Sequence, residues 1–107
     1  MNKKILAVTM RYDFYHNGRE IRNGIDYSLI NWIYKLGYSP LLIPNDLRYL
    51  KEINKKKING FILSGGNDLN IKQTRIILEN SILNFSKKEK IPVLGICHGM
   101  QLMNKFE

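Results

Sequence analysis

Four short apolar runs recur along the sequence, and longer amphipathic stretches separate them. The runs lie at residues 5–9, 40–43, 60–63 and 92–96, and they are rich in Ile, Val and Leu without regular polar alternation. Continuous runs of this kind are typical of strands that helices cover on both faces, as in a parallel sheet. The pattern therefore predicts an α/β fold in which strands and helices alternate.

Apolar residues between the first two runs recur at the spacing of a helix. Gly37 is placed to end this helix. A shorter and weaker helix is predicted at residues 46–53. We expect the apolar face of the first helix to pack in the core. This face comprises Ile25, Leu29, Ile30, Ile33 and Leu36.

A longer helix is predicted between the third and fourth runs, at residues 71–85. Its residues Ile77, Leu78, Ile82 and Phe85 can share one apolar face. Because the connection between two parallel strands is almost always right-handed, the simplest architecture is a three-layer sandwich with a flavodoxin-like parallel sheet.

The composition bounds the class of protein. A length of 107 residues suits one domain with a modest core. The apolar stretch near the amino terminus is too short for a signal peptide or a membrane span. A single cysteine cannot form an internal disulfide and suits a reducing compartment. We therefore expect a cytoplasmic protein with no membrane partner.

The chain is basic, with 17 Lys and Arg residues against 9 Asp and Glu residues. Lysines cluster at 51–57 and 87–90, just before predicted strands, where they usually lie on solvated helix ends and loops. No aromatic residues are interleaved with them to form a platform for nucleic acid. We expect no nucleic-acid partner, although the charge is compatible with a phosphate-bearing substrate.

The chain's one cysteine follows the fourth apolar run. Gly95 and Gly99 flank Cys97 at the spacing of a nucleophile elbow, a sharp strand-to-helix turn that needs small residues on either side. Residues 100–106 suit the start of the helix, whose free N–H groups would favour the thiolate. The pattern indicates either a nucleophilic Cys97 or a cysteine that is merely buried at such a turn.

A second loop, SGGND at residues 64–68, follows the third apolar run. Paired glycines let main-chain N–H groups approach a ligand, and in acyl-transfer sites such groups hold the oxyanion together with the N–H that follows the nucleophile. Gly66 and His98 are the candidates for an oxyanion hole through their main chains. The same sequence is also common as a plain strand-to-loop turn.

Together, the GGND and GICHGMQ segments resemble the class I glutamine amidotransferases, in the branch of the γ-glutamyl-γ-aminobutyrate hydrolases. The resemblance covers essentially the whole chain but only about the first half of such a domain. It implies that residues 1–107 are the amino-terminal part of a truncated domain. Further positions fall at spacings like those of this branch, namely Val8, Thr9, Arg11, Tyr27, Gly37, Pro40 and Pro44.

The resemblance implies a chemistry and the residues that perform it. Cys97 would attack the γ-carbonyl of a γ-glutamyl amide and form a thioester, which water would then hydrolyse without a cofactor. Gln101 matches a residue that helps to hold the substrate, and Gly66 matches the glycine of the oxyanion loop. Arg75 and Glu79 resemble an Arg and Glu pair of this branch, but we interpret them as surface residues of a helix.

The general base of the family is a histidine that a glutamate orients in a downstream H-x-E arrangement, and this sequence contains no such pair. His98 would point away from the sulfur of Cys97, and His16 lies in a polar loop where we expect it to be exposed. We therefore expect the chain alone to be inactive or nearly so, with a carboxy-terminal half supplied by a longer product or a second chain.

Metal and dinucleotide chemistry have no sequence support. One cysteine and two separated histidines lack ligand spacing, and no glycine-rich fingerprint follows the first run. Two alternatives to the hydrolase remain. The first is a non-catalytic remnant or small-molecule-binding module of the same fold, in which Cys97 would react like an ordinary thiol. The second is a flavodoxin-like redox protein, in which peroxide would oxidise Cys97 selectively.

Overall fold

The structure, a computed structural model, describes residues 4–64 and 73–96 of the chain. Its main sheet has four parallel strands in the order β4-β1-β5-β6. Each of these strands overlaps one of the four apolar runs, so the predicted parallel sheet is confirmed. The strands are β1 (Ile5–Thr9), β4 (Ser39–Ile43), β5 (Ile58–Leu63) and β6 (Val93–Gly95).

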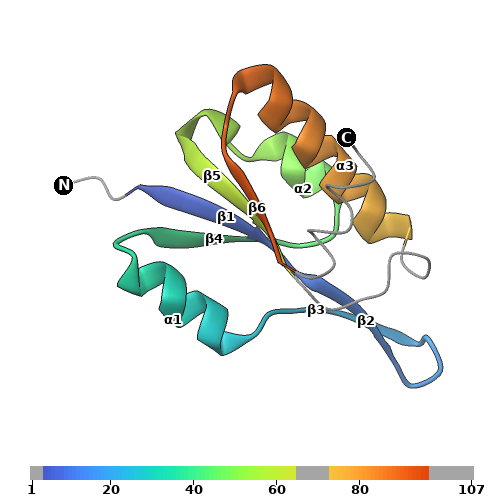
Figure 1. The fold of residues 1–107 in the computed structure, drawn as a ribbon. Coiled ribbons are helices and arrows are strands. Elements are labelled where there is room, and N and C mark those ends of the chain that lie inside the picture. Colours follow the sequence, from blue (N-terminus) through green and yellow to red (C-terminus); the bar gives the residue numbers. More distant parts are fainter. Residues whose placement is uncertain (1–3, 65–72, 97–107) are drawn as a thin grey trace.

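Helices cover both faces of the sheet (Figure 1). Helix α1 (Tyr27–Lys35) packs on one face, whereas α2 (Leu47–Glu52) and α3 (Gln73–Glu89) pack on the other. A short 3-10 turn, η1 (Lys55–Lys57), leads into β5. The protein is therefore a three-layer α/β sandwich of the flavodoxin-like type, as the sequence predicts.

Side chains of the central strands alternate between two cores, as the two-residue period of a strand requires. Val8 of β1 packs with Ile33 beneath α1. Ala7, the residue before Val8, points to the other face and packs with Leu78 of α3. Ala7, Val8, Ile33 and Leu78 are all fully buried. Both faces of β1 are thus excluded from water, which explains its continuous apolar sequence.

Helix α1 ends where the sequence predicts, and a side chain caps its beginning. The carboxylate of Asp26 accepts a hydrogen bond from the amide of Ser28 at 2.9 Å and caps the amino terminus. Gly37 ends the helix with a φ of 88°, a conformation that favours glycine. Leu36, which we predicted to lie in the core, is 49% exposed, because it is the C-cap residue.

Helix α3 buries most of the predicted face. Leu78 and Ile82 lie in the core and Phe85 packs against it, whereas Ile77 is 51% exposed and its predicted place on this face is wrong. The buried residues Arg75, Leu78, Glu79 and Ile82 follow the i, i+3, i+4, i+7 spacing of a helix face. The apolar pattern missed Arg75 and Glu79 because they are charged.

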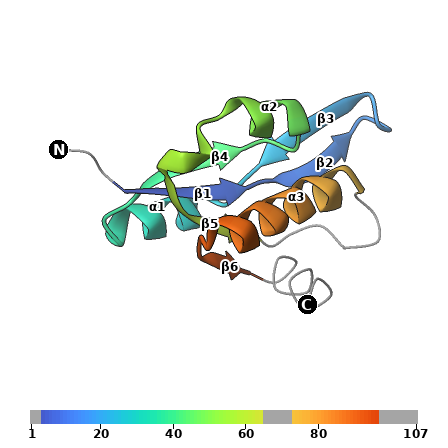
Figure 2. The same cartoon turned by 90° about the horizontal axis from the view of Figure 1, so that it is seen from above.

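A hairpin that the apolar pattern does not predict follows β1 directly. Its antiparallel strands are β2 (Arg11–Tyr15) and β3 (Glu20–Gly24), and they continue past the carboxyl end of β1 (Figure 2). The turn between them has positive φ angles at His16, Asn17 and Gly18. An Asn-Gly pair is a strong hairpin signal, so Asn17 and Gly18 were the available clue.

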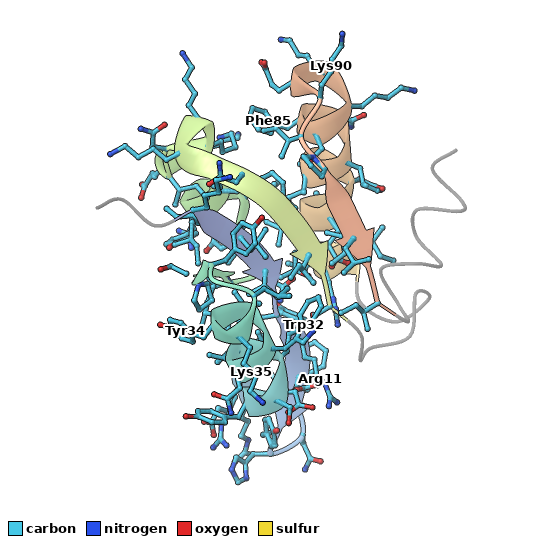
Figure 3. The ribbon with its side chains drawn as sticks, turned by 60° about the vertical axis from the view of Figure 1, so that its left-hand side comes forward. Arg11, Trp32, Tyr34, Lys35, Phe85 and Lys90 are labelled. Atoms are coloured by element: carbon cyan, nitrogen blue, oxygen red, sulfur yellow. The ribbon has the colours of Figure 1, made fainter. Side chains whose placement is uncertain are left out.

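The lysines of the two clusters lie on the surface, as predicted, except for one. Lys55 is half-buried because its Nζ donates to the carbonyl of Leu50 at 2.9 Å and lies over the ring of Phe85. Lys90 and Arg11 lie at distant parts of the molecule (Figure 3). Basic side chains therefore occur in widely separated parts of the structure.

A buried ion pair at the carboxyl ends of the strands

Strands β1 and β5 are neighbours in the sheet, but the chain leaves them in opposite directions. From β1 it passes through the hairpin and α1 to β4, and from β5 it passes through α3 to β6. Helices α1 and α3 lie on opposite faces (Figure 1). In α/β proteins the carboxyl ends of such a strand pair form the crevice in which ligands bind. The carboxyl ends of β1 and β5 are therefore the candidate active site.

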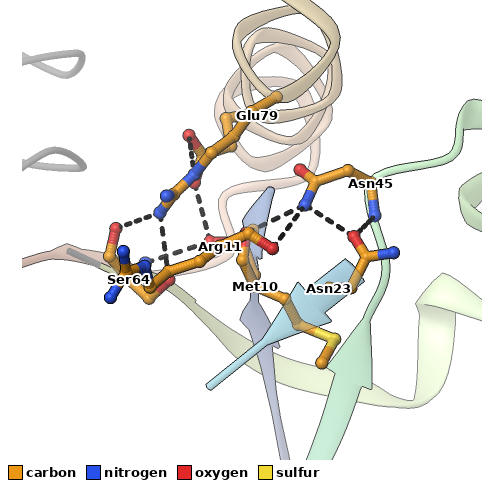
Figure 4. Close-up of polar contacts among 8 residues, drawn as sticks. Met10, Arg11, Asn23, Asn45, Ser64 and Glu79 are labelled. Atoms are coloured by element: carbon orange, nitrogen blue, oxygen red, sulfur yellow. Dashed lines mark hydrogen bonds and ion pairs between the residues drawn. The ribbon is translucent and has the colours of Figure 1, made fainter. Parts of the chain in front are cut away.

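Four residues at this end of the sheet form one hydrogen-bonded network, which we call the switch-point network (Figure 4). It consists of Thr9, Ser64, Arg75 and Glu79. The Thr9 hydroxyl donates to Oε2 of Glu79 at 2.7 Å and accepts from the amide of Ser64 at 3.0 Å. The guanidinium of Arg75 donates to the carbonyl oxygen of Ser64 at 2.5 Å and to its Oγ at 3.0 Å.

The network contains an ion pair that is closed to water. Nε of Arg75 lies 3.5 Å from Oε1 of Glu79, and both side chains are 0% exposed. Burial lowers the pKa of Arg75 below its ordinary value, and the nearby carboxylate of Glu79 opposes this effect. Arginine remains charged even so, because its ordinary pKa is very high. The carboxylate therefore compensates a buried positive charge.

These positions correct the sequence interpretation. Arg75 and Glu79 were expected on the surface of their helix, and that expectation is wrong, because both are fully buried. Charged side chains are almost never fully buried unless they are paired. Here they pair with each other across one helical turn and with polar groups at the end of β1 and β5.

The sequence held a signal for this network that the apolar pattern did not use. Arg75 and Glu79 share the spacing of Leu78 and Ile82, which are core residues. Thr9 is the only polar residue in the run 5–9, so a buried hydroxyl at the end of that strand required a partner. Charges in register with core positions therefore indicated a buried pair.

A second polar cluster attaches the hairpin to the same edge of the sheet. Asn45, which follows β4, is 6% exposed. Its main-chain amide and its Nδ2 both donate to Oδ1 of Asn23, at 2.9 and 2.8 Å. Its Nδ2 also donates to the carbonyl of Met10 at 2.9 Å (Figure 4). The base of the hairpin is thus fixed beside the carboxyl ends of β1 and β4.

Strand β6 brings the cysteine segment toward this edge. It pairs with β5 in parallel, with Gly95 opposite Leu63. The pairing continues beyond the strand, because the amide of Ile96 donates to the carbonyl of Leu63 at 2.9 Å. The next residue along the chain is Cys97. Four predicted site residues lie outside the described residues, and their roles stay predictions: Gly66, Cys97, His98 and Gln101.

The other candidate groups do not approach the switch-point network. His16 is in the hairpin turn, where its side chain is 71% exposed and its Nε2 lies 3.6 Å from Glu20, so its predicted exposure is confirmed. Within residues 4–64 and 73–96, no group of three potential metal ligands occurs. The helices of that same part are not long and apolar enough to cross a membrane.

A hollow of about 310 Å³ lies elsewhere on the sheet, on the side of α1. Its lining is mostly apolar and includes Trp32, Leu36, Gly60, Pro92 and Leu94. Gly60 and Pro92 are near the amino ends of β5 and β6, so the hollow is at the opposite end of the strands from the network. It is not part of the candidate active site.

The fold defines an α/β protein with a parallel sheet, whose carboxyl strand ends are the candidate ligand site. A family model, described as glutamine amidotransferase class-I, matches residues 20–106. This chain therefore belongs to the class I glutamine amidotransferase family, as the sequence resemblance indicates.

Individual relatives span the chain to different extents. Gamma-glutamyl-CDP-amidate hydrolase of Campylobacter jejuni is 33% identical over 94% of this chain and 54% of its own length. The glutamine-hydrolysing GMP synthase of Borrelia garinii is 48% identical over 53% of this chain but 10% of its own length. That of Prochlorococcus marinus is 41% identical over 60% of this chain and 11% of its own length. The chain thus spans about half the length of the hydrolase.

Proposed function

We propose that this chain carries the nucleophile of a cysteine-dependent hydrolase that cleaves γ-glutamyl amides. One observation carries the proposal. The hydrogen bond from the amide of Ile96 to the carbonyl of Leu63 joins the two segments that leave the sheet toward Cys97 and toward Gly66. Both segments start from neighbouring strand ends at the crevice where ligands bind in α/β folds. Membership in the glutamine amidotransferase family supports the same chemistry.

The reaction has two steps. The thiolate of Cys97 attacks the γ-carbonyl carbon of the substrate, the carbon–nitrogen bond breaks, and the amine leaves with an added proton. The product of this step is a thioester between Cys97 and the γ-glutamyl group. Water then adds to the thioester, the carbon–sulfur bond breaks, and glutamate and the free thiol are released. No electron transfer and no cofactor are needed.

The remaining roles follow from the motif positions. The main-chain N–H groups of Gly66 and His98 form the oxyanion hole, which stabilises the negative oxygen of each tetrahedral intermediate. Gln101 helps to hold the γ-glutamyl substrate. Of the part of the chain that the structure describes, Ile96 directly precedes Cys97, and Ser64 lies two positions before Gly66 and is bonded to Thr9.

The substrate class is a γ-glutamyl amide of a small molecule. The relative that spans 94% of this chain is named as a γ-glutamyl-CDP-amidate hydrolase, and this favours a stand-alone hydrolase. A net charge of +8 is compatible with a phosphate-bearing substrate. The second candidate is an ammonia-supplying glutaminase, since the GMP synthases match more than half of the chain.

The general base comes from outside the described residues. The one histidine among them, His16, is exposed and lies beside Glu20. We propose that a further segment or a second chain supplies the base. Without general acid–base help, turnover falls by about 10² to 10⁴. The 107-residue chain by itself is therefore expected to show little or no γ-glutamyl hydrolysis in an assay of glutamate release.

Covalent labelling tests the nucleophile without requiring turnover. The chain is incubated with a chloroketone analogue of glutamine, and the adduct is located by mass spectrometry. We expect one adduct on Cys97, formed faster than on glutathione at the same pH, because a helix amino terminus favours the thiolate. A Cys97→Ser variant is the matched control and should not be labelled.

The same experiment separates the alternatives. If free glutamine does not slow the labelling and Cys97 reacts no faster than glutathione, the hydrolase proposal is wrong and the chain is a non-catalytic binding module. If dilute peroxide oxidises Cys97 selectively while the chloroketone does not label it, the protein has a redox role. Protection by glutamine supports the hydrolase.

A further inference from the structure

We propose that Thr9, Arg75 and Glu79 are positioning residues that fix Ser64, and through it the ends of β5 and β6 from which the catalytic segments leave. The inference rests on the proposed function for its purpose, since it assigns the network a role beside Cys97. It goes beyond that function because it assigns roles to residues other than the nucleophile and the oxyanion hole.

The first argument concerns Ser64 itself. Its amide donates to Thr9, and its carbonyl and hydroxyl oxygens both accept from Arg75. All three polar groups of one residue are therefore held by buried side chains of β1 and α3. A strand end that only needed satisfied hydrogen bonds could use water for the same purpose. Three directed bonds instead fix both the place and the orientation of this residue.

The Thr9 hydroxyl makes the network directional. A hydroxyl has one hydrogen to donate, and the amide of Ser64 can only donate. The hydrogen of Thr9 must therefore point to Glu79, at 2.7 Å, while its lone pair faces Ser64, at 3.0 Å. The carboxylate of Glu79 accepts this hydrogen, and Nε of Arg75 lies 3.5 Å from its other oxygen. Each member thus depends on the others.

Ser64 is connected to the end of β6 through its neighbour Leu63 and one hydrogen bond. Leu63 directly precedes Ser64, and its carbonyl accepts from the amide of Ile96 at 2.9 Å. Ile96 directly precedes Cys97. A displacement of Ser64 would therefore move the carbonyl that holds Ile96, the residue before Cys97.

A purely stabilising role does not account for this choice of residues. A buried ion pair is costly to desolvate, and well-packed apolar residues of similar volume often stabilise a fold as well or better. The neighbouring buried positions of α3 are indeed apolar, as at Leu78 and Ile82. A guanidinium group has several N–H donors in a fixed plane, so it fixes the orientation of the groups that it binds, whereas an apolar side chain does not. This difference favours the positioning role.

The first test is a matched pair of variants at Thr9, made in the whole chain. Thr9→Val removes the hydroxyl and keeps the shape, whereas Thr9→Ser keeps the hydroxyl. Two quantities are measured in each: the exchange rate of the Ser64 amide proton by NMR, and the pH profile of Cys97 alkylation by iodoacetamide. Urea unfolding is measured in parallel, so that a global loss of stability is recognised.

We expect Thr9→Val to speed the exchange of the Ser64 amide about tenfold or more, because its acceptor is lost. We also expect the midpoint of Cys97 alkylation to rise by about one pH unit, which slows alkylation about tenfold near neutral pH. Thr9→Ser should match the original chain in both measurements.

A second variant, Arg75→Lys, keeps the positive charge but cannot hold two acceptors in a fixed fork. It should shift both readouts in the same direction as Thr9→Val. The proposal is overturned if Thr9→Val and Arg75→Lys leave both readouts as in the original chain, or if both readouts change only in proportion to global unfolding.

The two proposals fail in different ways. If Cys97 of the original chain alkylates like glutathione, the proposed function is wrong, and the exchange rate of the Ser64 amide alone decides the positioning role. If Cys97 is reactive but neither variant changes its pH profile or the exchange of Ser64, the nucleophile stands and the positioning role is wrong.

Discussion

Arg75 and Glu79 carry opposite charges in a site that excludes water. The burial of either charge is strongly destabilising unless the other is present. Polar groups at the ends of β1 and β5 also form hydrogen bonds with the pair. At the scale of the residue, the network therefore behaves as a unit, and the loss of one member leaves an uncompensated buried group.

This dependence predicts a large asymmetry between single and double substitutions. Glu79→Ala should lower the free energy of unfolding by about 3–5 kcal/mol, because it leaves the charge of Arg75 buried without its partner. The double variant Arg75→Met, Glu79→Leu should lose less than Glu79→Ala alone. Urea titrations followed by circular dichroism measure both.

Arg48 provides the control for this prediction, because it pairs with Asp46 at 2.7 Å on the surface. Arg48→Ala should change stability much less than Glu79→Ala, since exposed ion pairs are screened by solvent. Equal effects of Arg48→Ala and Glu79→Ala would contradict the importance that we assign to burial.

Sequence patterns pointed to the candidate nucleophile more readily than to the buried ion pair. Cys97 is prominent because it lies between two glycines after an apolar run. Arg75 and Glu79 are not, because charged residues on a helix usually face water, and their burial depends on the polar ends of strands that are distant in the sequence. Such partners become visible only when the sheet is assembled.

At the scale of the element, the hairpin of β2 and β3 is the least supported part of the described fold. It forms a separate two-stranded sheet, and it is anchored at its base by Asn23 and Asn45. Within it, the guanidinium of Arg22 lies 4.5 Å from the ring of Tyr15. Isolated hairpins are marginally stable in water, so we expect this one to open more readily than the main sheet.

Two glycines of the hairpin allow a matched test. Gly18 has a φ of 84° and no atom within 4 Å of an added Cβ, so Gly18→Ala would be strained by its backbone alone. We expect it to weaken the hairpin by about 1–2 kcal/mol. Gly24 lacks this conformation, and an added Cβ would meet Asp13 at an ordinary 3.9 Å.

Gly24→Ala should therefore have a small effect. Amide hydrogen exchange of β2 and β3, compared with that of β1 and β5, measures the opening of the hairpin separately from global unfolding. A uniform acceleration in both sheets after Gly18→Ala would be inconsistent with local opening.

Helix α2 has a pH-dependent cap. Hydrogen bonds from the side chain of Arg48 lower the pKa of Asp46 from 3.8 to about 2, and the amide of Arg48 also donates to this carboxylate. Because the pKa is lower in the folded chain, the stabilisation is fully present above pH 3.8 and is lost as the pH falls through about 2.

Asp46→Asn isolates the charge, since asparagine is also a good cap. The difference in unfolding free energy between the original chain and Asp46→Asn should be constant above pH 3.8 and should shrink between pH 3.8 and about 2. Urea titrations at several pH values provide this comparison. A difference that grows as the pH falls would have the wrong sign.

The sequence predicted correctly the elements whose apolar residues are extensively buried. β1 and β5 are covered on both faces, so their apolar runs are continuous. The hairpin was missed because its strands, RYDFY and EIRNG, are mostly exposed and contain charged residues, so neither forms a continuous apolar run. Its turn residues were a clearer signal than its strands.

At the scale of the whole molecule, the contacts that define the fold join distant parts of the chain. The sheet is parallel, so every pairing within it spans a crossover rather than a tight turn. The fold class was nevertheless predictable, because alternating strands and helices allow few right-handed arrangements. The strand order and the side chains that meet at the crevice depend on packing between elements that no local window contains.

The switch-point network has a consequence for the order of events in folding. The bond from Thr9 to Glu79 joins residues 70 positions apart, and that from Ser64 to Thr9 joins residues 55 positions apart. Such contacts require the closure of long loops, so we expect them to form late, after the folding barrier. Thr9→Val should then mainly accelerate unfolding and hardly slow folding. Stopped-flow measurements over a range of urea concentrations separate these two rates. A variant that slows folding as much as it speeds unfolding would place the network in the folding nucleus. If the expected result holds, the bonds that orient the crevice also set the lifetime of the folded chain.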